Sequence, residues 1–222
     1  MVRASRPRAR TSLRLRHPTL AYERELWQSG KRRIAGIDEV GRGSLAGPVS
    51  AAAVVLPKRP LGWYERVYDS KDLSPAARRE LVGPILADAA VGYAMVPAER
   101  VDADGIVPAT IRAMSAAVRA LGPGIDALLI DALELPEFEM QQVSLIKGDQ
   151  RSLSIACAAI VAKVTRDQVM SQLDKQYPGY GLGQNKGYGT AAHREAVQRL
   201  GPSPIHRLTF LSKLRPTGGP IS

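Results

Sequence analysis

Residues 34–48, IAGIDEVGRGSLAGP, decide the fold and the chemistry predicted for this chain. The stretch begins as an apolar run bounded by glycine, which is typical of a buried strand. The run ends on two adjacent carboxylates, Asp38 and Glu39. Because unpaired charge is costly to bury, a cation, a proton or a basic partner is expected beside them. Gly41-Arg42-Gly43 follows within three residues, so the stretch is interpreted as a functional site.

The patterns around this stretch predict an α/β domain. A second apolar run, residues 49–56, follows closely, so both strands are expected to be central in a sheet that is covered on both faces. Short connections favour antiparallel neighbours early in the chain, and the helical pattern before residue 127 favours a crossover to a parallel strand, so the sheet is expected to be mixed. The expected strands are 34–39, 49–56, 91–96, 127–130 and 142–146, and the expected helices are a short one that ends at Gly30, then 75–90, 98–105, 108–121, 153–173 and 191–200.

Basic charge is concentrated at the start of the chain. The 222 residues carry a formal net charge of +10, but residues 1–33 hold ten Arg and Lys against Glu23 and Glu25. The nearly balanced remainder must attract a polyanion through local placement of basic residues. Residues 1–18 are predicted to be a flexible basic arm, which is either solvated or binds phosphates nonspecifically. The Arg-rich start also resembles a transit peptide, although it lacks an apolar secretory core.

Composition indicates a globular protein of the cytoplasm. Hydrophobic residues make up 45% and charged residues 23% of the chain, and no apolar run approaches the roughly 20 residues that span a bilayer, so no membrane partner is expected. The single cysteine, Cys157, lies in an apolar stretch and is interpreted as a small buried hydrophobe. One main domain is expected at 19–210, a weakly structured end beyond Gly201 and a tail at 211–222.

Two strand ends predict a metal site. Asp38 ends one strand and Asp131 another, and parallel neighbours would bring both to the edge where open α/β sheets bind ligands. Glu39 would point to the other side unless the chain turns, and Gly41 favours a turn there. Carboxylates without a histidine or cysteine cluster suit Mg²⁺ or Mn²⁺ better than zinc. The scattered histidines, His17, His193 and His206, are expected to have ordinary polar roles.

Other candidate residues have two possible roles each. Asp149 stands directly before a helix, so it is either an N-cap, which spacing alone favours, or a further ligand. Beside the carboxylates, Arg42 can hold a phosphate, and its flanking glycines let backbone groups approach a ligand. Tyr188, between two glycines, suits stacking on a sugar or base or packing on the surface. Four lysines extend a possible phosphate track: Lys71, Lys147, Lys163 and Lys186.

Taken together, these residues resemble bacterial type 2 ribonuclease H, the ribonuclease HII family. The resemblance runs from residue 20 to 210 and rests on GIDEVGRG at 36–43, DSK at 69–71, Asp131, KGD at 147–149, AKVTRD at 162–167 and KGYGT at 186–190 with His193. One departure is Ala132, where the family commonly has glycine after the third carboxylate. The related type 3 enzymes are similar too, but usually have threonine in place of Arg42.

The resemblance implies a ribonuclease H-like fold, with a mixed five-stranded sheet flanked by helices and extra helices at the C-terminal end. It implies an endoribonuclease that cleaves the RNA strand of RNA/DNA hybrids and nicks on the 5′ side of single ribonucleotides in duplex DNA, leaving 5′-phosphate and 3′-hydroxyl ends. Two Mg²⁺ or Mn²⁺ ions would be held by the family's carboxylates, and a monomer is expected. The implied ligands are Asp38, Glu39, Asp131 and Asp149, and the implied substrate contacts are Gly41, Arg42, Gly43, Lys71 and Tyr188.

Two alternatives stay open at this stage. A nuclease of the same fold could act on DNA junctions or ends, and comparing all-DNA with ribonucleotide-containing duplexes would separate the two activities. A binding protein without catalysis, driven by the basic arm, is disfavoured because such a protein has no need of four acids facing a polyanion.

Overall fold

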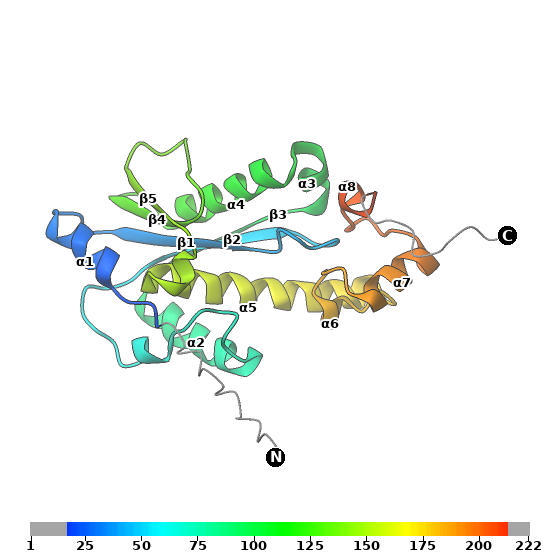
Figure 1. The fold of residues 1–222 in the computed structure, drawn as a ribbon, viewed down its shortest axis with the longest axis horizontal. Helices are drawn as coiled ribbons and strands as arrows, with labels where there is room; N and C mark the ends of the chain where they lie inside the picture. The colour runs from blue at the N-terminus through cyan, green and yellow to red at the C-terminus, as the bar shows by residue number, and fades with distance from the viewer. Residues whose placement is uncertain (1–16, 213–222) are drawn as a thin grey trace, which may run out of the picture.

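The structure is a computed structural model that describes residues 17–212, so most of the predicted arm and tail lie outside it. The described chain forms one five-stranded sheet with helices on both faces (Figure 1). The strands are β1 (Ile34–Val40), β2 (Val49–Val55), β3 (Ala90–Val96), β4 (Ala127–Asp131) and β5 (Gln141–Leu145). The helices are α1 (Ala21–Gln28), α2 (Pro75–Asp88), α3 (Ala98–Asp104), α4 (Ile106–Ala120), α5 (Leu153–Gln176), α6 (Leu182–Asn185), α7 (Ala191–Leu200) and α8 (Leu208–Leu211).

The strand order β3-β2-β1-β4-β5 puts β1 at the centre. β1 runs antiparallel to β2 and parallel to β4, which confirms the mixed sheet. The parallel pairing runs from Ile34 opposite Ala127 to Ile37 opposite Ile130. Asp38 and Asp131, each the next residue along its strand, therefore lie at the same edge of the sheet.

Small residues let helices lie close to both faces of the sheet. In β2, Ala52 faces the core beneath α5, whereas Ala51 and Ala53 face the core beneath α4, as strand alternation requires. Figure 1 shows α5 along the length of one face with α2 outside it, and α4 on the opposite face. Gly36 marks the closest approach of β1 to α5, because a Cβ there would lie 2.3 Å from the backbone and Oγ of Ser154.

The C-terminal region differs from the prediction. The chain beyond Gly201 was expected to be weakly structured, but His206 forms a β-bridge with Ala46, and His206 and Arg207 are both buried. Pro202 and Pro204 break regular structure ahead of α8, and side-chain hydrogen bonds from Arg207 to distant backbone hold the segment, which no periodic pattern indicates. The short helices α6 and α8 were also not predicted.

The long helix α5 does not cross a membrane. No helix within residues 17–212 is long and apolar enough to do so. α5 instead buries its first half in the core, where Cys157 is fully buried as predicted. Burial raises the pKa of the Cys157 thiol, so the thiol stays neutral.

Candidate active site

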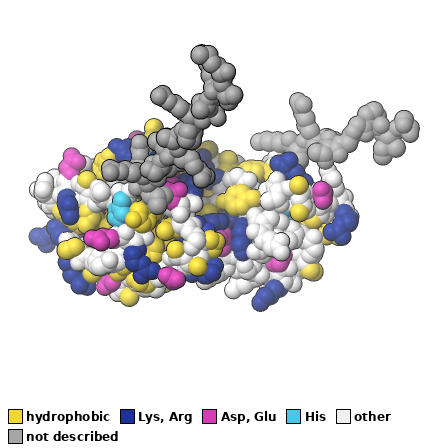
Figure 2. Space-filling view, turned by 60° about the horizontal axis from the view of Figure 1, so that its bottom comes forward, with side chains coloured by type: hydrophobic (Ala, Val, Ile, Leu, Met, Phe, Trp, Pro, Cys, Tyr) yellow, Lys and Arg dark blue, Asp and Glu magenta, His cyan; other side chains and the backbone are white. Residues whose placement is uncertain are grey.

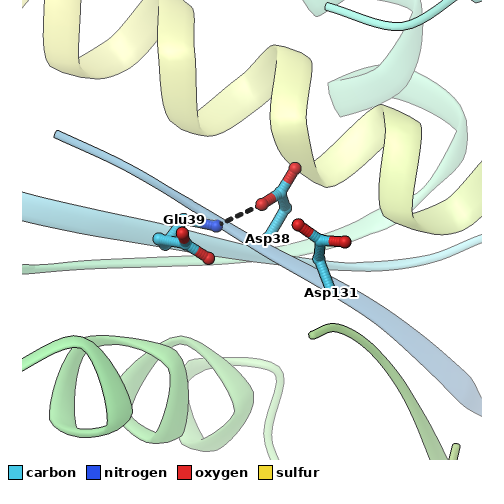
Figure 3. A group of neighbouring side chains, drawn as sticks. All are labelled: Asp38, Glu39 and Asp131. Carbon is cyan, nitrogen blue, oxygen red and sulfur yellow. Dashed lines mark hydrogen bonds between the residues drawn. The ribbon is translucent and has the colours of Figure 1, made fainter. Parts of the chain in front are cut away.

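Three carboxylates converge where β1 and β4 end. One oxygen from each of Asp38, Glu39 and Asp131 lies within 4.8 Å of the others (Figure 3). The backbone N–H of Glu39 donates to Oδ1 of Asp38 at 2.7 Å, which fixes the Asp38 side chain against its own strand. The convergence of Asp38 with Asp131 that the sequence predicted is thus present.

The turn that Gly41 favoured is present, but it comes after Glu39. β1 continues through Val40, and the chain turns only at Gly41, whose φ is +91°. Pairing between β1 and β4 has already ended at Ile37, and a Glu39 oxygen lies within 4.8 Å of an oxygen of Asp38 and of Asp131. Its Oε2 atom is buried and has no hydrogen-bond partner among the described residues.

Burial and crowding raise the pKa of two of these carboxyl groups, Asp38 and Glu39. The pKa of Asp38 is raised well above its usual value, first by burial and then by the carboxylates of Glu39, Asp131 and Asp149. Burial also raises the pKa of Glu39, although the Arg42 guanidinium opposes that rise. A divalent cation would remove both penalties at once, because it replaces lost water as the partner of the charged form.

Asp149 is not a helix cap. Ser152 caps α5, and its side chain accepts from the N–H of Ile155, so the interpretation that spacing favoured was wrong. Asp149 lies in the 3-10 turn η2 (Gly148–Gln150), where it is buried and accepts from Lys71 Nζ at 3.2 Å. Burial raises its pKa, Lys71 opposes the rise, and Asp69 and Asp131 add to it. Asp149 thus lies beside the three-carboxylate group but outside it.

Asp69 is a further acidic neighbour that sequence reasoning did not single out. It is buried and accepts from Lys71 N and from Gln150 Nε2, both at 2.9 Å. Burial opposes its ionisation, but these hydrogen bonds outweigh burial and hold the pKa of Asp69 below its usual value. Asp69 therefore stays a carboxylate that orients Lys71 and the Asp149 turn. Its position in a loop, 80 residues from Asp149, gave no local signal of this role.

The loop after β1 forms one wall of the site. Arg42 Nη1 lies 3.4 Å from Glu39 Oε1, so the arginine reaches back to the carboxylates. A Cβ on Gly41 would meet Arg166 Nε at 2.3 Å, whereas a Cβ on Gly43 would meet nothing within 4 Å. Gly41 is thus required by packing, and Gly43 leaves open space. A cavity of about 310 Å³ lies here, lined by Asp38, Glu39, Val40, Gly41, Arg42, Gly43, Ser70, Lys71, Arg78, Asp131, Ala159, Lys163 and Tyr188.

Tyr188 lines the same cavity, next to the loop after β1. It forms an isolated bridge with Ser44, and its ring lies 5.6 Å from Lys163 Nζ and 5.7 Å from Arg166 Cζ. Lys186 Nζ donates to Ser171 Oγ at 2.9 Å, and Lys147 is exposed. Of the four predicted lysines, Lys71 and Lys163 therefore line the cavity. Figure 2 shows a face with a hollow near its middle, where basic and acidic side chains lie close together.

Comparison with known proteins agrees with the fold and the sequence. The family model described as Ribonuclease HII matches residues 35–213. Ribonuclease HII of Chloroflexus aurantiacus is 50% identical over 197 residues, which cover 87% of this chain and 93% of that protein. Ribonuclease HII of Geobacillus kaustophilus is 50% identical over 192 residues, which cover 86% of this chain and 73% of that protein.

Solved structures share the fold at low identity. RNase HII from Archaeoglobus fulgidus, in a complex with PCNA, has a TM-score of 0.72 at 22% identity, over 85% of this chain and 98% of that one. Bst-RNase HIII in complex with Mn²⁺ has a TM-score of 0.62 at 20% identity, over 82% of this chain and 65% of that one.

The fold, with acidic residues at the ends of its central strands, is that of the ribonuclease H-like nucleases. Within that class the matches over most of the chain are specific. The chain belongs to the ribonuclease HII family. It is accordingly an endoribonuclease of the ribonuclease H type, and its family is metal-dependent and acts on RNA/DNA hybrids.

Proposed function

We propose that this protein uses two divalent ions, Mg²⁺ or Mn²⁺, to nick duplex DNA on the 5′ side of single embedded ribonucleotides, besides cleaving the RNA strand of hybrids. The products are a 5′-phosphate and a 3′-hydroxyl, and the cellular role is removal of ribonucleotides from DNA. The observation that carries the proposal is the three-carboxylate group beside a loop with open space at Gly43.

The residues present fit divalent cations. Glu39 Oε2 is buried without a hydrogen-bond partner within residues 17–212, and the pKa of Asp38 is raised by burial and by its carboxylate neighbours, so a cation among these oxygens would stabilise the charged forms of both residues. All the candidate ligands are carboxylate oxygens, which hard cations prefer. Asp38, Glu39 and Asp131 would hold the ions, and Asp149 would contribute from the adjoining turn. When bound, such ions activate a water and stabilise the leaving 3′-oxygen in an in-line displacement at phosphorus.

The protein's own residues select and orient the substrate. Arg42 and Lys71 line the cavity and can each bind a phosphate oxygen next to the carboxylates. Backbone groups of Gly41-Arg42-Gly43 can meet the 2′-hydroxyl, which is the feature that distinguishes a ribonucleotide from its DNA neighbours. Tyr188, which lines the same cavity, packs against the adjoining deoxyribose.

The proposal extends to the state of the protein in the cell. It acts as a monomer in the cytoplasm, on RNA/DNA hybrids and ribonucleotide-containing duplexes. Gel filtration with light scattering checks the monomer, and cell fractionation checks the location.

The deciding experiment compares three duplexes of one sequence: all-DNA, DNA with one ribonucleotide, and an RNA/DNA hybrid. With Mg²⁺ or Mn²⁺ the second is nicked at the 5′ side of the ribonucleotide, the third is cleaved, and the first stays intact. Asp38→Asn removes all cleavage while the circular dichroism spectrum is kept. Full activity in that variant, or in excess chelator, would overturn the mechanism, and cleavage of the all-DNA duplex would favour a junction or end nuclease.

A second variant isolates the proposed 2′-hydroxyl contact. Gly43→Ala places a methyl group in open space, so the thermal midpoint should match that of the wild-type protein. Cleavage at the single ribonucleotide should nevertheless fall, by about tenfold or more. Undiminished cleavage would show that this loop does not sense the ribose. Gly41→Ala is unsuitable, since it would clash with Arg166.

A further inference from the structure

The loop from Arg42 to Gly47 carries the substrate contacts proposed above. It is hydrogen-bonded to the C-terminal segment at residues 205–207. Gly47 N–H donates to Ile205 O at 2.8 Å, and Arg207 N–H donates to Leu45 O at 2.8 Å. These backbone bonds, with the Ala46–His206 bridge, fix the two segments in register. The segment belongs to the region whose order the sequence did not predict.

The Arg207 side chain reaches further into the same loop. It is fully buried, and it donates from Nη1 to Arg42 O at 3.0 Å. Its Nε and Nη2 donate to Gly47 O at 3.1 and 2.9 Å. The forked guanidinium thus spans both ends of the loop, a geometry that a lysine ammonium cannot reproduce. Burial and the nearby Arg166 lower the pKa of Arg207 to about 10, which still leaves all its donors in place at neutral pH.

The preceding residue, His206, connects to the backbone at Tyr188, which lies next to the same loop. Its Nε2 lies 3.1 Å from Nε2 of His193, and His193 Nδ1 lies 2.9 Å from Tyr188 O. Because a carbonyl only accepts, His193 carries its proton on Nδ1 and accepts on Nε2 from His206. His206 then accepts on Nδ1 from Ser203 N–H at 3.1 Å. Every donor in this chain of hydrogen bonds has an acceptor when both imidazoles are neutral.

We propose that Arg207 and His206 are a pair of positioning residues for the candidate active site: Arg207 fixes the Arg42 loop, and His206, through His193, fixes the backbone at Tyr188. Neither touches the reacting atoms. They brace two neighbouring segments that are also joined directly by the Ser44–Tyr188 bridge and by the N–H of Leu45, which donates to Gly187 O at 2.7 Å. The inference rests on the proposed function for its effect on activity, but the anchoring can be tested without it.

The test compares Arg207→Lys with a control, Asp102→Ala, in which a residue of α3 that holds the same C-terminal segment is removed. Asp102 accepts from the N–H groups of Leu208 and Thr209, so its loss loosens α8 without removing a contact to the Arg42 loop. Two quantities are measured in the full chain: amide hydrogen exchange of residues 42–47, and KM and kcat for the duplex with one ribonucleotide.

Arg207→Lys should speed exchange at 42–47 by roughly tenfold and raise KM by roughly tenfold, with a smaller change in kcat. Asp102→Ala should leave both at wild-type values. The proposal would be overturned if hydrogen exchange in Arg207→Lys stayed at the wild-type rate, or if exchange changed while KM did not. It would also be overturned if Asp102→Ala raised KM by the same factor.

A second variant covers the case in which Arg207→Lys does not fold. His206→Phe keeps a ring beside Tyr180, whose centroid lies 4.8 Å from that of His206, but removes the hydrogen bond to His193. His206→Phe should speed amide hydrogen exchange at residues 187–190 and raise KM. Exchange at the wild-type rate would overturn the proposal. If the wild-type protein fails to cleave, the proposed function fails, and the exchange data alone decide whether the pair anchors the two loops.

Discussion

Lys71 Nζ lies 3.2 Å from Oδ2 of the buried Asp149, so a flexible cation from the loop before α2 is held at the edge of the carboxylate group. Burial disfavours the charged form of Lys71, but Asp149 and Asp69 outweigh burial and raise its pKa. The lysine therefore stays charged next to the place where a phosphate would enter.

Replacing this cation should weaken substrate binding in a salt-dependent way. For Lys71→Ala we expect kcat/KM to fall by about tenfold, and the slope of log affinity against log salt to shrink by about 1, because one phosphate contact is lost. Fluorescence anisotropy at several salt concentrations measures the slope. Lys58→Ala, an exposed lysine beside Trp27, is the control and should change neither. An unchanged slope in Lys71→Ala would exclude the phosphate contact.

Without bound metal, the Asp38 carboxylate should destabilise the folded state. Its raised pKa means that the folded state disfavours the charged form, so Asp38→Asn should increase the free energy of unfolding at pH 7 by about 1 kcal/mol or more. Urea unfolding in chelator measures the change. Asp126→Asn is the control of opposite sign, because two backbone N–H groups lower the pKa of that exposed carboxylate. A less stable Asp38→Asn would contradict the electrostatic account.

The close contact between β1 and α5 should tolerate no side chain at Gly36. A Cβ would lie 2.3 Å from Ser154, so Gly36→Ala should lower the free energy of unfolding by about 3 kcal/mol or more, through overpacking. Gly62→Ala is the matched control, since its Cβ would meet nothing within 4 Å. Thermal unfolding of both variants checks this expectation. Equal midpoints would mean that α5 can shift away from the sheet.

Ala132 should be a site of removable strain. It follows Asp131 with φ at +53°, in the left-handed region, where a residue with a Cβ costs roughly 1–2 kcal/mol. Glycine avoids that cost but loses about 0.5–1 kcal/mol in chain entropy. Ala132→Gly is therefore expected to raise the free energy of unfolding by about 0.5 kcal/mol. Chemical denaturation measures it, and a decrease would show that the turn is not strained.

Acid should destabilise the His193–His206 pair. Burial and His193 lower the pKa of His206 to about 4, and burial also lowers the pKa of His193. The unfolded state therefore takes up protons first, and stability falls as pH drops from about 6.5 towards 4, by about 2 kcal/mol. Urea unfolding at pH 7 and 4.5 measures this loss. Other carboxylates titrate in the same range, so the informative quantity is the difference from His206→Phe, which should lose less stability.

The central fold was predictable because its signals are local. Buried strands and amphipathic helices appear as apolar runs and helical spacing, and two strand-end carboxylates indicated the edge where Asp38 and Asp131 meet. The start of α2 is a local feature of the same kind, since the Ser74 side chain accepts from Ala77 N–H ahead of Pro75. These features depend on neighbours within a few residues.

The rest depends on contacts between distant segments. Asp149 was favoured as a cap because spacing could not show that Ser152 takes that position. Asp69 is hydrogen-bonded to a side chain about 80 residues away, and Arg207 to backbone about 160 residues away. No sequence pattern indicates which residues form these pairs. Such polar contacts do not repeat along the chain, so hydrophobic periodicity does not predict them.

The parallel pairing of β1 with β4 also has a consequence for how the molecule matures. β2 can join β1 through a short connection, but Asp38 gains Asp131 only after more than ninety further residues have been synthesised and β4 has docked. Such high-contact-order pairing forms late and slowly. The cluster of carboxylates is thus absent from a nascent chain until β4 has docked, and the onset of divalent-ion binding would report that this pairing has formed.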